Sequence, residues 1–182
     1  MSYDFLYKFV LVGDKNVGKT SYLDNLVGNS YVNIYRPTLG VDFYTKSITL
    51  HDNIVIKTHI WDTAGDDKFG QIIKGYYLGT AGIIVMFDIT NRQSFINVDM
   101  WVNKIKNINK DVIPIFLIGS KLDNSERRTV SMKDANDYAN SRNMRYMEIS
   151  SKNDINVFGS FKTLVSKIYS RMDTIDLGPG IK

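Results

Sequence analysis

Short apolar runs alternate along this chain with segments whose apolar side chains recur every three or four residues. The apolar runs predict β-strands, and the helical spacing predicts amphipathic helices. The expected strands cover residues 7–12, 41–50, 54–61, 81–89, 112–120 and 145–150. The expected helices cover residues 20–27, 94–108, 131–142 and 157–172. Strands 81–89 and 112–120 are apolar on both faces, which is typical of strands buried between layers of helices.

This alternation predicts an α/β fold with one mostly parallel, six-stranded sheet, right-handed crossovers and helices on both faces. Only three residues separate strands 41–50 and 54–61, so these strands should form a hairpin that adds one antiparallel edge strand. A chain of 182 residues is long enough for a single core. We expect one domain over residues 1–175, followed by a short flexible tail at 176–182.

The composition excludes several classes of function. The chain has no Cys, which excludes disulfides, Cys-ligated zinc and thiol catalysis, and which fits a reducing cytoplasm. The net charge of +4 is small and the lysines are scattered, so we expect no nucleic-acid partner. No apolar run approaches the roughly 20 residues of a membrane span. The first residues lack the layout of a signal peptide.

One motif carries strong chemical information. Residues 13–20, Gly-Asp-Lys-Asn-Val-Gly-Lys-Thr, fit the phosphate-loop pattern G-x-x-x-x-G-K-[ST]. The motif follows an expected strand and opens an expected helix, where backbone N–H groups can hold phosphates. Lys19 would reach the β- and γ-phosphates, and the Thr20 hydroxyl would bind Mg²⁺. The alternative is a glycine-rich turn with a solvated lysine, which this context disfavours.

A second candidate site lies at the end of the expected strand 54–61. Asp62 could hold the Mg²⁺ shell, usually through water, because Mg²⁺ keeps several of its waters. Gly65 would let its backbone N–H approach a γ-phosphate closely. The alternative, that Asp62 only caps a turn, is disfavoured by the phosphate loop nearby.

Five motifs in order resemble those of small GTPases of the Ras superfamily. They are GDKNVGKT (13–20), RPTLGVDF (36–43), WDTAG (61–65), GSKLD (119–123) and EISSK (148–152). The resemblance is strongest to the Rab branch, in RPTLGVDF and in the segment 74–95. The tripeptides at 38–40 and 68–70 are similar to Ran. The resemblance implies a G domain of the P-loop NTPase fold that hydrolyses GTP.

The same resemblance implies a role for each matching residue. GTP or GDP would be the nucleotide, Asp123 would select guanine, and Thr20, Thr38 and Asp62 would hold Mg²⁺. Lys19, Gly65 and Asp66 would take part in hydrolysis. The implied nucleotide-binding residues are Lys15, Asn16, Val17, Gly18, Lys19, Thr20, Ser21, Tyr31, Tyr35, Thr38, Gly65, Lys121, Asp123, Ser151 and Lys152.

The resemblance also implies partners. Effector proteins would dock on an aromatic triad of Phe43, Trp61 and Tyr76, for each of which core packing is the alternative. An exchange factor and a GTPase-activating protein are expected, and the chain should act as a cytoplasmic monomer in membrane trafficking. Without Cys the sequence contains no prenylation site, which leaves two alternatives: a prenylated tail was removed, or the GTPase works unanchored. The abundance of Asn, Ile, Lys and Tyr is typical of AT-rich genomes, such as those of protists or large DNA viruses.

Three departures from the family pattern bear on activity. Asp66 replaces the Gln that orients the attacking water, and an ionised Asp can only accept hydrogen bonds. Lys15 adds bulk at the position where the arginine finger of a GTPase-activating protein would enter. Ser120 replaces an Asn of the guanine motif, which should weaken binding at the guanine end of the site. We therefore expect slow hydrolysis, with ordinary turnover as the alternative if Asp66 swings aside. A GTP-bound docking module, a Ran-like transport GTPase and a nucleotide kinase or ATPase also remain open, although Asp123 disfavours the last.

Overall fold

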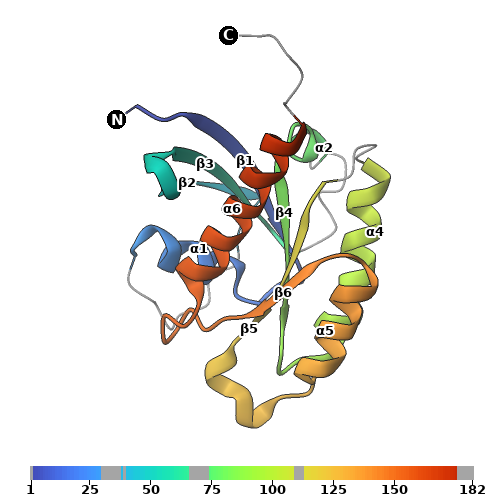
Figure 1. The fold of residues 1–182 in the computed structure, drawn as a ribbon. Helices are drawn as coiled ribbons and strands as arrows, with labels where there is room; N and C mark the ends of the chain where they lie inside the picture. The colour runs from blue at the N-terminus through green and yellow to red at the C-terminus, as the bar shows by residue number, and fades with distance from the viewer. Residues whose placement is uncertain (1, 30–37, 39, 66–73, 109–112, 176–182) are drawn as a thin grey trace.

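The computed structural model describes residues 2–29, 38, 40–65, 74–108 and 113–175. Within these ranges six strands form one sheet in the order β2-β3-β1-β4-β5-β6 (Figure 1). The strands are β1 (Phe5–Val12), β2 (Val41–Thr49), β3 (Val55–Thr63), β4 (Gly82–Asp88), β5 (Ile115–Ser120) and β6 (Arg145–Glu148). Only β2 and β3 pair antiparallel among these strands, and the other neighbours are parallel. The predicted α/β fold with one antiparallel edge strand is therefore confirmed.

The helices cover both faces of the sheet (Figure 1). The described α-helices are α1 (Lys19–Val27), α2 (Lys74–Tyr77), α3 (Arg92–Ile96), α4 (Val98–Ile108), α5 (Met132–Ser141) and α6 (Val157–Ile175). In the described residues, the 3₁₀ turn η1 (His51–Asn53) connects β2 to β3, and the 3₁₀ turn η3 (Leu122–Arg127) lies between β5 and α5. α1 and α6 pack on one face, whereas α4 and α5 pack on the other. No helix in the described part of the chain is both long and apolar enough to cross a bilayer.

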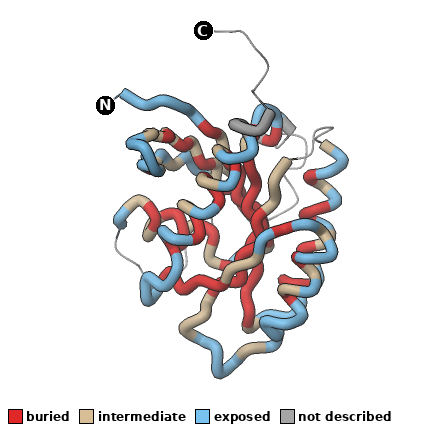
Figure 2. The backbone as a smooth tube through the Cα atoms, in the orientation of Figure 1, coloured by how far each residue is buried: buried red, intermediate tan, exposed pale blue. Residues whose placement is uncertain are grey.

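Alternating side chains of the central strands fill two separate cores. In β1, Phe9 and Leu11 pack toward α1 and α6, whereas Val10 and Val12 pack toward α4. Every residue of β4 is buried, as expected for a strand between two helix layers. Figure 2 shows buried residues along the central strands and exposed residues on the outer sides of the helices. The carboxyl ends of these packed parallel strands lie at the edge where such sheets bind ligands.

Several predicted boundaries are wrong. The single helix expected at 94–108 is two helices, α3 and α4, which meet at Asn97. Asn91 starts α3 early because its side chain accepts hydrogen bonds from the backbone N–H groups of Gln93 and Ser94. β3 continues past the predicted end at residue 61, since Asp62 and Thr63 still pair with β2.

One other difference arises from local hydrogen bonding. β6 ends at Glu148, before the predicted residue 150, because Ser150 forms a bridge with Ile155 instead. The helix expected at 131–142 is present as α5, and the Ser131 hydroxyl caps its start by accepting a hydrogen bond from the backbone N–H of Asp134.

Candidate functional site

The loop between β1 and α1 is shaped by a glycine and a lysine. Gly13 has a φ of +143°, and a Cβ there would lie 2.1 Å from the Met86 carbonyl oxygen, so only glycine fits. Lys19, the first residue of α1, is buried, and its ammonium donates to the carbonyls of Gly13 and Asp14, each at 2.8 Å. The lysine therefore folds back over the loop and places a positive charge at the N-terminus of α1.

Burial of Lys19 has an electrostatic consequence. Desolvation lowers the pKa of its ammonium to about 8, against the opposing effect of the nearby carboxylates Asp62 and Asp14. The lowered pKa means that the negative charges near Lys19 do not fully offset the free-energy cost of burying its ammonium. An anionic ligand such as a phosphate would therefore be stabilised beside it.

The three predicted metal ligands come together although they are far apart in the sequence. The Thr20 hydroxyl donates to Asp62 Oδ2 at 2.6 Å. Thr38 Oγ1 lies 2.9 Å from Thr20 Oγ1 and 3.5 Å from Asp62 Oδ2. A helix start, a strand end and a loop thus direct three oxygen atoms to one point, and oxygens are the ligands that Mg²⁺ prefers.

Asp62 carries the clearest sign that this cluster is incomplete by itself. Its side chain is fully buried, and Oδ1 has no hydrogen-bond partner among the described residues. Burial raises the pKa of this carboxyl to about 6, against hydrogen bonds that lower it. A buried polar atom is normally satisfied. A hydrated divalent cation would satisfy Oδ1 and offset the cost of the buried charge, so the residues present fit Mg²⁺.

Gly65 lies directly against the phosphate loop. A Cβ at this position would be 2.2 Å from the Lys15 nitrogen and 2.4 Å from the Asp14 carbonyl carbon. Any side chain would force the two segments apart. Gly65 therefore lies against the phosphate loop, and the approach of its backbone N–H to a γ-phosphate stays a prediction.

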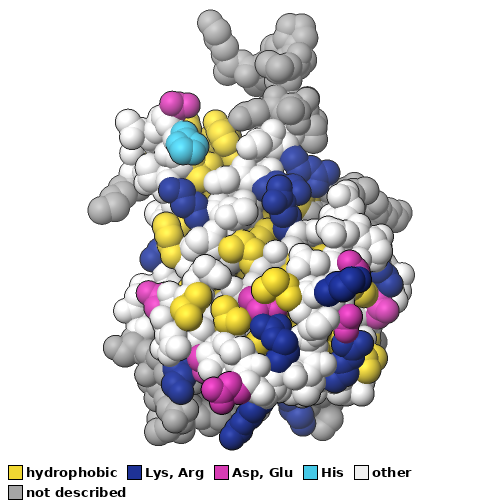
Figure 3. All heavy atoms as spheres, turned by 60° about the horizontal axis from the view of Figure 1, so that its bottom comes forward, with side chains coloured by type: hydrophobic (Ala, Val, Ile, Leu, Met, Phe, Trp, Pro, Cys, Tyr) yellow, Lys and Arg dark blue, Asp and Glu magenta, His cyan; other side chains and the backbone are white. Residues whose placement is uncertain are grey.

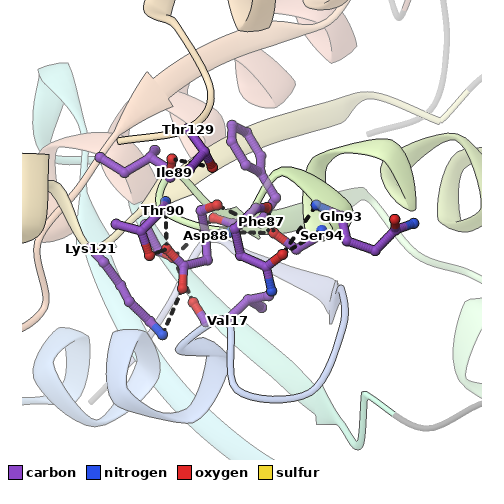
Figure 4. Close-up of polar contacts among 11 residues, drawn as sticks. Val17, Phe87, Asp88, Ile89, Thr90, Gln93, Ser94, Lys121 and Thr129 are labelled. Carbon is purple, nitrogen blue, oxygen red and sulfur yellow. Dashed lines mark hydrogen bonds and ion pairs between the residues drawn. The ribbon is translucent and has the colours of Figure 1, made fainter. Parts of the chain in front are cut away.

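The residues predicted to bind the base gather around η3 and the segment after β6. Asp123 accepts a hydrogen bond from the Ser150 hydroxyl at 2.7 Å, and the Ser151 carbonyl accepts one from Asn25 of α1. The Lys121 ammonium pairs with Asp88 at 2.8 Å, and Asp88 also accepts from the backbone and hydroxyl of Thr90 (Figure 4). This end of the site is thus linked by hydrogen bonds to α1 and β4.

Ser120 links β5 to the phosphate loop. Its Oγ lies 2.6 Å from the Val17 carbonyl oxygen and 2.9 Å from the Phe87 carbonyl oxygen, and the expected weakening of the guanine-binding end stays a prediction. The strand positions this buried side chain so that it reaches the phosphate loop directly. A hydroxyl has one hydrogen, however, so it donates to only one of these carbonyls at a time.

Two members of the predicted effector triad pack together on the sheet. Phe43 of β2 and Trp61 of β3 are opposite each other in register, with ring centroids 4.9 Å apart. Phe43 is half exposed, so core packing does not account for it, whereas Trp61 is partly buried. Lys8 lies 6.0 Å from the Trp61 ring and donates to the Leu78 carbonyl, which links this surface to the end of α2.

The other predicted residues are placed less informatively. Lys15, Asn16 and Lys152 are exposed, Val17 is buried, and Gly18 and Ser21 are half-buried. Tyr31, Tyr35 and Asp66 lie outside the described residues, as do the tail at 176–182 and the side chain of Tyr76. Figure 3 shows Lys and Arg side chains interspersed with Asp and Glu on the face it draws, in keeping with the lysines scattered along the sequence.

Sequence reasoning missed three polar residues that organise the site. Asp88 ends a buried strand, which is the same signal that identified Asp62 and could have identified Asp88. Ser150 and Asp14 lie inside recognised motifs but received no role, because a motif does not show which neighbours a side chain contacts.

A comparison with protein families agrees with this geometry. A family model described as "Ras: Ras family" matches residues 8–170. The match covers the phosphate loop, the cluster of Thr20, Thr38 and Asp62, and the segments around Lys121 and Ser151.

Proposed function

The chain belongs to the Ras family of small GTPases, and from that premise we propose that it is a Rab-like GTP/GDP switch with slow intrinsic hydrolysis. The observation that carries the proposal is the convergence of Thr20, Thr38 and Asp62, with a buried Asp62 oxygen left without a partner among the described residues. Mg²⁺ would bind there and, when bound, would neutralise charge on the β- and γ-phosphates.

The chain's own groups divide the work along the nucleotide. Lys19 and the N–H groups at the start of α1 would hold the phosphates, and Gly65 would approach the γ-phosphate. Asp123 would accept from the guanine N–H groups while Ser150 keeps its carboxylate in place. Thr38 would join the metal only when a γ-phosphate is present, which gives the switch two states.

The Rab-like assignment rests on the motif RPTLGVDF and on the adjacent rings of Phe43 and Trp61. A half-exposed aromatic side chain beside a second ring is suited to protein recognition, because aromatic side chains are enriched at interfaces. We propose that effectors dock there, that an exchange factor and a GTPase-activating protein regulate the state, and that the protein acts in membrane trafficking.

Slow hydrolysis is proposed because of Asp66. An ionised Asp beside the γ-phosphate can accept from a water but cannot donate toward the charge that develops in the transition state. Loss of one such donor lowers a rate by roughly 10²–10³. If turnover is negligible, the protein would instead be a GTP-bound docking module.

Single-turnover hydrolysis of GTP tests this proposal directly. We expect Asp66→Gln to raise the rate by on the order of 100-fold at neutral pH. Competition of ATP against GTP in the same preparation checks the nucleotide class. A wild-type rate equal to that of Asp66→Gln would show that Asp66 does not limit hydrolysis, and preference for ATP would overturn the assignment as a GTPase.

A further inference from the structure

The phosphate loop contains a carboxylate whose purpose is not evident from phosphate binding. Asp14 is the second residue of the motif, and its two oxygens accept hydrogen bonds from Asn97, which directly precedes α4, and from Trp101 within α4. Trp101 Nε1 donates to Oδ1 at 2.8 Å, and Asn97 Nδ2 donates to Oδ2 at 2.7 Å. The side chain thus joins the loop to a helix more than 80 residues away in the sequence.

A negative charge in this loop has a cost that its contacts must offset. Like charges repel, so a free carboxylate there would oppose binding of an anionic nucleotide. The two donors hold the charge toward α4. Asp14 also helps to keep Lys19 protonated, since its charge counteracts the lowering of the Lys19 pKa that burial causes.

Asp14 lies where several parts of the candidate site meet. Its backbone carbonyl accepts from the Lys19 ammonium at 2.8 Å. The peptide that follows it lies so close to Gly65 that a Cβ there would be 2.4 Å from the Asp14 carbonyl carbon. A shift of Asp14 would therefore move the lysine's acceptor and the surface against which Gly65 packs.

We propose that Asp14 is the positioning residue of the phosphate loop, whose carboxylate fastens the loop to Asn97 and Trp101 and thereby holds Lys19 where the nucleotide phosphates bind. This inference rests on the proposed binding of phosphate by residues 13–20. Asp14 itself does not contact the nucleotide in this arrangement, because both of its oxygens are directed to the helix.

A simpler reading is that Asp14 only satisfies a buried indole. Trp101 is 2% exposed, and a buried indole N–H needs an acceptor. One neutral acceptor would suffice for that purpose, however, whereas the structure supplies a charged group with a second donor from Asn97. The two readings differ in whether the rate of nucleotide release depends on this contact.

The variants Asp14→Ala and Asp14→Asn separate the readings. Alanine removes both hydrogen bonds. Asparagine keeps an acceptor for Trp101. Its N–H can donate to the Asn97 side-chain oxygen if the Asn97 amide turns over, and the exposed Gln93 amide, which donates to that oxygen in the wild type, can turn over with it. We expect Asp14→Ala to speed release of a fluorescent GDP analogue about tenfold, the equivalent of 1.4 kcal/mol. Asp14→Asn should stay within about threefold of wild type, because it preserves the link.

Asp99→Ala is the matched control. Asp99 is also a carboxylate of the α4 region, but it contacts Tyr138 and Arg142 on the side of α5. Its removal weakens the packing of α4 without touching the loop. GDP release from this variant should equal that of wild type, whereas acceleration as large as that of Asp14→Ala would overturn the proposal by showing that any weakening of α4 suffices.

The Trp101 indole supplies a readout that does not depend on activity. The chain has two Trp residues, so a Trp61→Phe spectrum identifies the Trp101 indole N–H resonance. In the GDP complex this resonance should move in Asp14→Ala and stay near its wild-type position in Asp14→Asn. If Asp14→Ala does not fold, Asn97→Ala, which removes one donor only, should accelerate release by a smaller factor.

The outcomes distinguish this inference from the proposed function. Failure of the wild-type protein to bind GDP would refute the proposed function and the inference with it. Binding by wild type with equal release from wild type and Asp14→Ala would refute the inference alone. Release from Asp14→Asn as fast as from Asp14→Ala would also refute it, because the preserved hydrogen bonds would then have no effect.

Discussion

At the phosphate end of the site, the buried charges of Lys19 and Asp62 are not fully offset by neighbouring groups. At the base end, by contrast, the charged side chains have ion-pair or hydrogen-bond partners within the protein. Lys19 has a lowered pKa and Asp62 a raised pKa, both because of burial. At the base end, Lys121 pairs with Asp88, and Asp123 accepts from Ser150. The comparison indicates that the phosphate end depends on its ligand for charge balance, while the base end is assembled in advance.

This difference follows from what each end recognises. A phosphate and a metal ion bring opposite charges that compensate buried protein groups, so those groups are poorly satisfied without them. A guanine base is neutral and is recognised by directional hydrogen bonds, which require acceptor atoms held in fixed positions. Changes at the phosphate end should therefore alter affinity strongly, and changes at the base end should alter selectivity and release.

The largest effect should come from Lys19→Met. Methionine keeps an apolar chain in the buried space but removes the ammonium, which would make charge-assisted hydrogen bonds to two phosphates. Because such bonds contribute about 1.5–3 kcal/mol each, affinity for a non-hydrolysable GTP analogue, which carries both the β- and the γ-phosphate, should fall on the order of 1,000-fold in equilibrium titrations. Lys133→Met, at an exposed lysine of α5, is the control and should bind normally. Unchanged affinity in Lys19→Met would contradict the ligand-dependent character of the phosphate end.

The base end should respond to Asp123→Asn with a change of selectivity. Asparagine presents an N–H group to the base, which suits the C2 oxygen of xanthine better than the amino group of guanine. The ratio of XDP to GDP affinity should rise about 100-fold, as expected when a buried polar group loses its partner. Competition titrations measure this ratio. If GDP binding is indifferent to the change, Asp123 does not contact the base.

The sequence was sufficient for the sheet, because strands buried on both faces, such as 81–89, have a continuous apolar pattern. The resemblance also grouped Thr20, Thr38 and Asp62 by the role that it implies for them, and the structure brings these three side chains together. The sequence could not show the contact of Asp14 with Trp101, because a hydrogen bond between distant segments leaves no local pattern. For the same reason it could not show that the Ser120 hydroxyl contacts the Val17 carbonyl.

A smaller effect should appear in the pH dependence of stability without nucleotide or Mg²⁺. The folded-state pKa of Asp62, about 6, lies above its unfolded value, so the folded protein binds more protons between these values. Stability relative to Asp62→Asn should therefore rise by about 1 kcal/mol as the pH falls from 7 to 5. Denaturant titrations measure the difference, and Mg²⁺ with GDP should remove it by holding the carboxylate ionised. An identical pH profile in the two proteins would mean that Asp62 is already compensated.

The smallest effect, and the sharpest test of the base end, concerns Ser120. Its hydroxyl links β5 to the phosphate loop through the Val17 carbonyl, so it connects the two ends that the comparison separates. Ser120→Ala removes this single neutral hydrogen bond, and GDP release should become about threefold faster, in line with a contribution of roughly 0.5–1.5 kcal/mol. Ser120→Asn restores a donor of greater reach and should release GDP no faster than wild type. Stopped-flow measurements with a fluorescent GDP analogue resolve such differences.

If Ser120→Ala releases GDP at the wild-type rate, the phosphate loop is held by other contacts and the phosphate and base ends are independent. If release accelerates more than in Asp14→Ala, the β5 link outweighs the α4 link in holding the loop.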